Sequence, residues 1–160
     1  METKEAAQMQ VAVDQIQEGP NTRTHMDAAS LREFAANVKK VGVLEPVLLR
    51  KDEKGHWVLI AGHRRLAAAK IAGLKEIPAR YLEVDESQAA EIQTLENLHR
   101  ENLPALDEAR DFKQLLDKGS HTVETLASKV DRSVKYIYRS IRLLDLPKDC
   151  LLYTSDAADE

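Results

Sequence analysis

The first hundred residues alternate between the two-residue period of strands and the longer period of helices. Apolar and polar positions alternate over Val11–Ile16, which is typical of a strand, whereas apolar residues recur at helical spacing over 31–41. Asp27 or Ser30 can cap that helix, and Gly42 stands where its C-terminal cap belongs. The remaining pattern predicts strands at 46–50, 57–60 and 77–82, a helix over 64–72, and a flexible N-terminus over 1–10.

From residue 86 onward the predicted elements are all helical. The sequence predicts helices over 86–99, 107–118, 122–130 and 133–144, with Pro104 ending the segment that follows the first of them. We therefore expect an α+β fold. A small mixed-sheet domain over 11–103 is followed by an all-helical domain over 104–149.

The composition is that of a core-forming soluble protein, since 43% of the 160 residues are apolar and 31% are charged. No apolar run approaches the roughly 20 residues of a membrane span, and the N-terminus lacks the pattern of a secretory signal. The single cysteine, Cys150, excludes a disulfide framework and a cysteine metal cluster. A cytoplasmic protein without a membrane partner is expected.

The last eleven residues, 150–160, differ from the rest of the chain. They continue no periodicity, carry three acidic residues, and resemble the in-frame translation of a sequencing-library adapter. We expect adapter read-through, with the native sequence interrupted near Asp149 and the helical domain incomplete; the alternative is a genuine acidic tail. Residues 121–149 then stand out as the basic segment, with a formal net charge of +2.

A glycine and two arginines stand where the predicted strand at 57–60 gives way to a helix. Gly62 allows close backbone approach, and the first N–H groups of a helix attract anions. Arg64 and Arg65 add forked donors that suit phosphate. The chemistry of the segment suits an anion such as phosphate, but the segment alone is better explained by an ordinary glycine turn with two surface arginines.

A second polar motif, Glu96-Asn97-Leu98-His99-Arg100, stands near the end of the helix predicted over 86–99. Glu96 and Asn97 are oxygen ligands of the kind that Mg²⁺ accepts, and Arg100 could meet phosphates. By itself, the motif is better explained by an exposed ion pair between Glu96 and Arg100, which are four residues apart.

The helices predicted over 122–130 and 133–144 have the pattern of a helix–turn–helix. Their shared core is expected to comprise Leu126, Val130, Val134, Ile137 and Ile141, with Ala127 at the close crossing. Asp131 must take the left-handed turn position that glycine usually occupies. The second helix is basic on its exposed face, as in a helix that lies in the DNA major groove. The expected DNA-contacting residues are Thr122, Arg132, Ser133, Lys135, Tyr136, Arg139 and Arg142.

In this order, the three motifs resemble the ParB family of partition proteins over residues 11–149. The family loop, Gly-Glu-Arg-Arg-x-x-Ala, is matched by Gly62–Ala68, and its second motif by Glu96–Arg100. Gly42–Val47 is similar to the family's Gly-x-x-Gln-Pro stretch, and Asn21–Arg23 to its early turn.

The resemblance implies a CTP-binding N-terminal domain that uses Mg²⁺, and a helical domain that binds a centromere-like palindrome in double-stranded DNA. It implies a sliding clamp that CTP closes and slow CTP hydrolysis reopens, a homodimer in the full-length protein, and a ParA-type ATPase partner. Glu96 and Asn97 would bind Mg²⁺, and no general base is assigned. The implied nucleotide-binding residues are Arg23, Glu45, Gly62, His63, Arg64, Arg65, Ala68, Glu96, Asn97 and Arg100.

Two residues depart from the family pattern, because His63 stands where the family has Glu and Glu45 where it has Gln. Both positions bear on nucleotide identity and turnover. The alternatives are a helix–turn–helix transcription regulator on the same scaffold and a ParB-like nuclease, although no carboxylate cluster for two metals is evident. The N-terminal fold also resembles sulfiredoxin, but Gly62-His63 replaces the cysteine which that repair chemistry needs.

Overall fold

A computed structural model describes residues 8–20, 27–147 and 149–150 of the chain. Contacts divide the protein into two compact units, unit 1 up to Gln93 and unit 2 from Thr94, and each is described by itself. The division falls ten residues before the domain boundary expected at 103. No helix in the described part of the chain is both long and apolar enough to cross a membrane.

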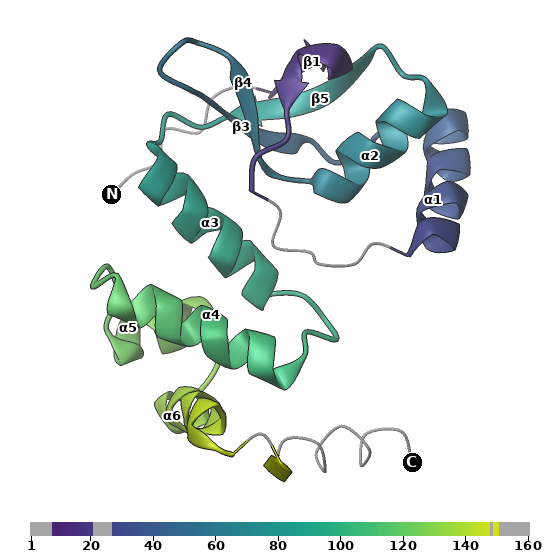
Figure 1. Cartoon of the computed structure of the whole chain (residues 1–160). Helices are drawn as coiled ribbons and strands as arrows, with labels where there is room; N and C mark the ends of the chain where they lie inside the picture. Colours follow the sequence, from purple (N-terminus) through teal and green to yellow (C-terminus); the bar gives the residue numbers. More distant parts are fainter. Residues whose placement is uncertain (1–7, 21–26, 148, 151–160) are drawn as a thin grey trace. The chain divides into compact units, whose positions relative to one another are not determined.

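Unit 1 is built on a mixed five-stranded sheet in the order β1-β5-β3-β4-β2 (Figure 1). Strand β3 pairs antiparallel with β4 and parallel with β5, and β5 pairs antiparallel with β1. The short β2 runs parallel to β4 at the other edge. The strands are β1 (Gln8–Ala12), β2 (Ile16–Gln17), β3 (Val47–Lys51), β4 (Trp57–Ala61) and β5 (Glu76–Tyr81).

The strand expected over 11–16 is divided in two by the 3₁₀ turn η1 (Val13–Gln15). Val13 and Ile16 are both buried, and their spacing of three does not fit the period of a strand. A 3₁₀ turn places residues i and i+3 on one side, which lets both reach the core. Residues 8–10, expected to be flexible, instead pair with β5 as part of β1.

Pro78 lies in β5, between β1 and β3, although a proline predicts an edge strand or the first residue of a strand. It faces Gln10 of β1, and the pairing of β5 with β3 begins only at Ala79. At Pro78 the strand therefore has a paired neighbour on one side only, which a residue without an N–H group can tolerate.

Helices α1 (Ala28–Val41) and α2 (His63–Ala72) form two layers on one face of the sheet (Figure 1). Leu66 and Ala69 of α2 pack with the sheet core, while Ala68 packs on the opposite side with Ala35 and Val38 of α1. Alanines keep α2 slim enough to lie between two partners. Val41 of the predicted apolar stripe is 57% exposed, because it stands at the last residue of α1.

Helix α3 (Glu86–Leu98) covers the other face of the sheet with its first half. Ala89 and Ile92 pack there against Ile60, Leu82 and Leu48, which alternate with the side chains that face α2. Both faces of the sheet are therefore buried, which explains why β3 and β4 read as nearly continuous apolar runs.

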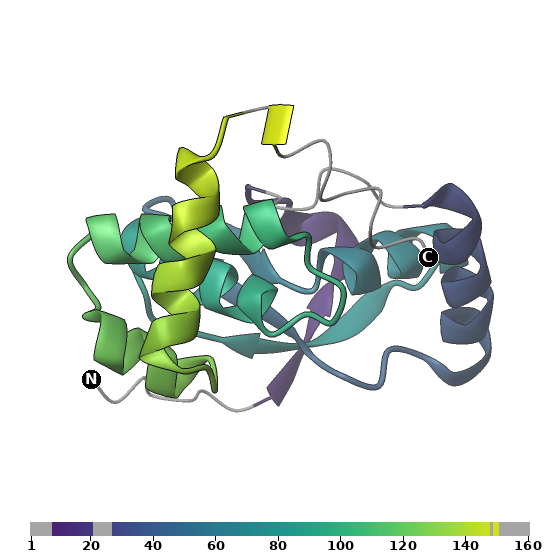
Figure 2. The same ribbon diagram turned by 90° about the horizontal axis from the view of Figure 1, so that it is seen from below.

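Unit 2 is all-helical and is formed by the end of α3, α4 (Ala105–Asp117), α5 (Val123–Lys129), α6 (Val134–Arg142) and the 3₁₀ turn η2 (Leu143–Asp145). Helix α6 crosses α4 in this unit (Figure 2). Phe112, Leu115, Leu126 and Ile137 are fully buried at its centre. The expected fold class, a mixed-sheet domain followed by a helical one, is confirmed. Of the tail expected over 150–160, the described residues include only the exposed Cys150.

Candidate functional site

Gly62 joins β4 to α2 in a conformation that few other residues could adopt. Its φ of 103° lies in the region that favours glycine, and an added Cβ would stand 2.7 Å from Cγ1 of Val47. Leu66 N–H donates to the Gly62 carbonyl at 3.0 Å, so α2 begins directly after the turn. The start of α2 therefore lies at the place expected for an anion, because the first N–H groups of a helix have no acceptor within the helix itself.

Arg64 is fixed beside this helix start by α1. Its Nη2 donates to Ser30 Oγ at 2.7 Å, and its guanidinium carbon lies 5.1 Å from the centre of the Phe34 ring. Arg64 is only partly exposed. Since a guanidinium carries five N–H donors, the contact with Ser30 leaves others for a ligand.

Arg65 is held by the segment that leads into β3. Its Nη1 donates to the Pro46 carbonyl at 2.9 Å, and its Nη2 forms an ion pair with Glu45 Oε2 at 2.7 Å. Glu45, expected near the nucleotide, thus lies in the same cluster as Gly62, Arg64 and Arg65. In this cluster its carboxylate occupies a donor of Arg65.

The other expected nucleotide residues of unit 1 have different surroundings. Ala68 of α2 is fully buried and packs against Ala35 and Val38 of α1, and its nucleotide-binding role stays a prediction. His63 is partly buried, and its charge is one of the influences that lower the pKa of Glu18, after the hydrogen bond and charge of Lys70. Arg23 lies outside the described residues.

The Glu96-Asn97-x-x-Arg100 motif lies at the end of α3, in unit 2. Asn97 is buried, its Nδ2 donates to Asp111 Oδ2 at 2.6 Å, and its Oδ1 accepts from Arg100 Nη1 at 2.9 Å. Glu96 is exposed. Both polar atoms of the Asn97 amide are therefore engaged within unit 2.

These residues do not fit a resident metal site. The oxygen of Asn97 already accepts from a guanidinium, whose positive charge opposes a cation at the same atom. Within residues 8–20, 27–147 and 149–150, no group of three or more His, Cys, Asp or Glu side chains could hold a metal ion. The expected Mg²⁺ role of Glu96 and Asn97 thus has no support in the geometry of unit 2.

Asp111 yields a prediction on pH. Burial raises its pKa, and this outweighs the hydrogen bond from Asn97, which lowers it. A carboxyl whose pKa is higher when folded contributes stability below its unfolded pKa, about 4, and loses it as the pH rises through the folded pKa. Asp111→Asn removes the charge and keeps an acceptor for Asn97. Its melting temperature should exceed that of the parent by several degrees at pH 7, but not at pH 4.

Thermal unfolding at the two pH values checks this expectation. Asp117→Asn, at an exposed position of the same helix, is the control for the loss of a charge. An equal gain for Asp111→Asn at both pH values would show that burial of the charge is not the cause.

The α5–turn–α6 segment has the predicted helix–turn–helix core and turn. Asp131 adopts a φ of 52°, and the following Arg132 N–H donates to the Ala127 carbonyl at 3.0 Å. Thr122 Oγ1 accepts from Thr125 N–H at 3.2 Å, and Ser133 Oγ accepts from Tyr136 N–H at 3.1 Å. Two of the expected DNA-contacting side chains, Thr122 and Ser133, are thus helix caps in this structure.

Four expected DNA-contacting cations lie on the exposed surface around α6. They are Arg132, Lys135, Arg139 and Arg142. Tyr136 is more constrained, because its hydroxyl donates to Glu108 Oε2 at 2.8 Å, which raises the pKa of the phenol, and its ring packs edge-on against Phe112. Arg132 stacks on the same ring at 5.1 Å. The cations therefore form one basic face that Tyr136 anchors to α4.

Sequence reasoning missed the residues that hold these side chains in place. Ser30 fixes Arg64, Asp111 fixes Asn97, and Glu108 fixes Tyr136. Each partner is 14 to 34 positions away along the chain, so no local spacing could indicate it. Tyr138, 52% exposed on α6, was also missed, although an aromatic residue on a basic helix is a usable signal.

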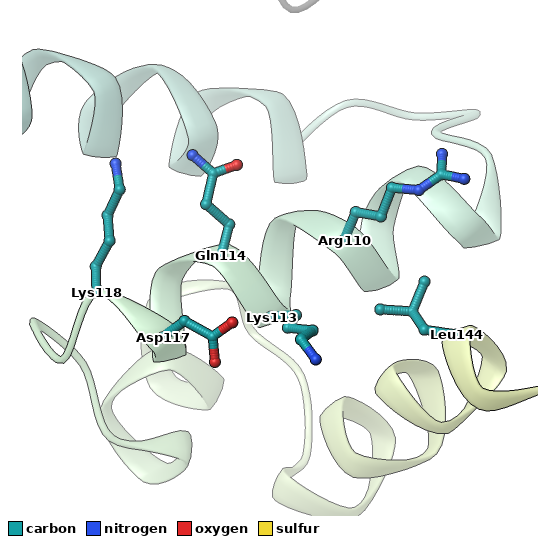
Figure 3. A pocket seen from close by; sticks show the side chains of 6 residues that line it. All are labelled: Arg110, Lys113, Gln114, Asp117, Lys118 and Leu144. Carbon is teal, nitrogen blue, oxygen red and sulfur yellow. The ribbon is translucent and has the colours of Figure 1, made fainter.

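A surface hollow of about 420 Å³ lies elsewhere on unit 2 (Figure 3). Four of its lining residues belong to α4, a fifth is the residue that follows this helix, and Leu144 of η2 closes one side. The first five are exposed, so the hollow is an open groove between surface side chains. They are Arg110, Lys113, Gln114, Asp117 and Lys118.

The sequence matches the family models "ParB N-terminal domain" over residues 1–98 and "ParB HTH domain" over residues 101–157. Probable chromosome-partitioning protein ParB of Neisseria meningitidis serogroup A is 42% identical over 139 residues, 86% of this chain and 49% of the relative. Stage 0 sporulation protein J of Bacillus subtilis is 41% identical over 127 residues, 79% of this chain and 45% of the relative. The chain thus spans about half the length of these curated relatives.

Two solved structures are also similar, both of the C-terminally truncated chromosome-partitioning protein ParB from Caulobacter crescentus and both 29% identical. The one complexed to the centromeric parS site has a TM-score of 0.80 and covers 93% of this chain and 78% of that chain. The one complexed with CTP-gamma-S has a TM-score of 0.56 and covers 96% and 87%. With family matches over both units and relatives above 40% identity, the expected resemblance is confirmed, and this chain belongs to the ParB family.

Proposed function

We propose that this chain is the nucleotide- and DNA-binding part of a DNA-partition protein. Unit 2 binds a centromere-like site in double-stranded DNA, and unit 1 binds CTP. The observation that carries the proposal is the helix–turn–helix of unit 2, with Asp131 in the tight turn and a row of exposed cations on and beside α6. The parS and CTP-gamma-S complexes of the Caulobacter crescentus relative support the same assignment.

The DNA-binding step follows from the charge and shape of α6. A helix fits the major groove, where Arg and Lys hold phosphates or donate to guanine edges. Arg139 and Lys135 extend from α6 itself, while Arg132 lies in the turn before it. The hydrogen bond of Tyr136 to Glu108 keeps α6 fixed on α4, so the basic face is presented as a rigid surface.

The nucleotide-binding step uses the start of α2. Backbone N–H groups after Gly62 would meet phosphate oxygens. Arg64, held by Ser30 of α1, and Arg65, held by the Pro46 carbonyl before β3, would flank them. Mg²⁺ is expected to accompany the triphosphate, whose own oxygens are its preferred ligands. The chain's residues supply binding and orientation, and no catalytic base is proposed.

In more detail, we propose that the full-length protein acts as a clamp on DNA. CTP binding would close this clamp, and slow CTP hydrolysis would reopen it. This proposal rests on family membership, as do a homodimer in the full-length protein, a ParA-type ATPase partner and a location on the nucleoid or a plasmid in the cytoplasm. A transcription regulator on the same scaffold is distinguished by its DNA binding, which would be indifferent to CTP.

Replacing Arg139 by alanine tests the DNA assignment. The variant should bind a centromere-like palindrome roughly 10- to 100-fold more weakly, because one charged contact in the groove is worth about 1–3 kcal/mol. Its CTP affinity should stay at the level of the parent. Fluorescence anisotropy with the palindrome and a scrambled duplex, each at two salt concentrations, measures the loss and its sequence dependence.

Arg110→Ala is the matched control for this experiment. It removes the same charge from unit 2, but from α4, where Asp107 already forms an ion pair with Arg110 at 2.9 Å. If Arg110→Ala weakened binding as much as Arg139→Ala, total charge and not the α6 face would govern DNA binding.

A further inference from the structure

We infer that Glu45 competes with the phosphates of the nucleotide for Arg65 and thereby sets the affinity of the site. The inference rests on the proposed nucleotide-binding function and adds to it a residue that tunes affinity. Its basis is the 2.7 Å ion pair between Glu45 Oε2 and Arg65 Nη2, one of the two arginines at the start of α2.

Glu45 is held near Gly62 and Arg65 by the two residues that follow it. Pro46, whose ring restricts its own φ and the conformation of Glu45, accepts from Arg65 Nη1 at 2.9 Å. The next residue, Val47, packs so closely on Gly62 that only a glycine fits there. The segment from 45 to 47 therefore contacts the 62–65 loop at both ends, and the Glu45 carboxylate cannot withdraw far from it.

The ion pair between Glu45 and Arg65 is weak enough to open, but the Glu45 carboxylate remains near Arg65 when it does. The Glu45 side chain is 75% exposed, and an exposed ion pair contributes little to stability. A triphosphate carries several negative charges and can displace one carboxylate from Arg65. The displaced carboxylate then stays within a few ångströms of those charges and repels them, so part of the binding free energy is lost.

Arg64 is not subject to the same competition. Its polar partner in the described contacts is the neutral Ser30, and its ring partner is Phe34. The two arginines therefore differ in availability. Arg64 offers its positive charge to an anion directly, whereas Arg65 does so only after Glu45 has moved aside.

The inference is tested by calorimetric titration with CTP and Mg²⁺ of two full chains, the parent and the variant Glu45→Gln. This variant keeps the size of the side chain and removes the charge. It should bind CTP roughly tenfold more tightly at low ionic strength, and the gain should shrink at high salt because screening weakens the repulsion. Glu53→Gln is the matched control, since this exposed residue follows β3 at the opposite end from Glu45 and should leave the affinity unchanged.

The outcomes separate the inference from the function on which it rests. Unchanged or weaker CTP binding by Glu45→Gln, with the parent binding well, would overturn the inference and leave the function intact. Inorganic triphosphate serves as a second probe. Tighter binding of this probe by Glu45→Gln, without binding of any nucleotide by either protein, would support the competition and overturn the CTP assignment. Binding of neither probe by either protein would overturn both.

Discussion

Replacing Arg64 by alanine is expected to abolish CTP binding while DNA binding persists. Arg64 is the arginine of the loop whose charge no carboxylate neutralises in its described contacts, and Ser30 and Phe34 hold it beside the first turn of α2. A charged hydrogen bond contributes about 1.5–3 kcal/mol, and loss of two such bonds lowers affinity by roughly 100-fold or more. Calorimetry with CTP, ATP, GTP and UTP, each with Mg²⁺, measures the loss and the base selectivity.

Two further variants make the result specific to the loop. Lys39→Ala removes a charge near the other end of α1, nine residues from Ser30, and should bind CTP like the parent. Arg64→Lys keeps the charge without the forked geometry and should recover part of the affinity. The loop assignment would be wrong if Arg64→Ala bound CTP as well as the parent.

Replacing Gly62 by alanine is expected to destabilise unit 1 strongly. The substitution meets two independent costs, about 1–2 kcal/mol for a side chain at positive φ and about 1–3 kcal/mol for crowding against Val47. A total of about 3 kcal/mol lowers the melting temperature of a domain of this size by roughly 10–20 °C. Differential scanning calorimetry of the parent and the variant measures the shift.

Gly55→Ala separates the two costs. Gly55 also has a positive φ, of 84°, but an added Cβ there would have nothing within 4 Å. This variant should lose only the conformational part, about 1–2 kcal/mol. Equal losses at the two glycines would mean that the close approach of Val47 has no energetic effect and that the turn at Gly62 adjusts freely.

Local chemistry explains what the sequence predicted correctly. Asp131 was expected at positive φ because two helices with a shared core leave only a tight turn between them, and it adopts a φ of 52°. Of the two caps considered for α1, Asp27 is the one observed, since its Oδ2 accepts from Ser30 N–H at 3.1 Å. Turns and caps depend on neighbouring residues, so the chain itself contains the information.

Tertiary pairing explains what could not be predicted. The pattern could identify Asn97 as a polar residue at a helix end, but not that Asp111 would engage it, because that contact requires α3 and α4 to pack. The packing role of Ala68 depends in the same way on α1, which covers α2. The 3₁₀ turn η1 arises because Val13 and Ile16 must share one core, which a single-strand pattern does not represent.

The hydrogen bonds of Asn97 link the stability of the helical unit to any ligand that uses this side chain. One amide has one oxygen and one NH₂ group, and Arg100 and Asp111 occupy both. A ligand at Asn97 must first open these bonds, so its apparent affinity is reduced by the population of the open state. A substitution that weakens the bond to Asp111 but leaves the Asp111 charge buried would then shift two properties in opposite directions. It would lower the melting temperature of unit 2 and tighten the binding of such a ligand, a trade-off that a simple contact residue does not produce.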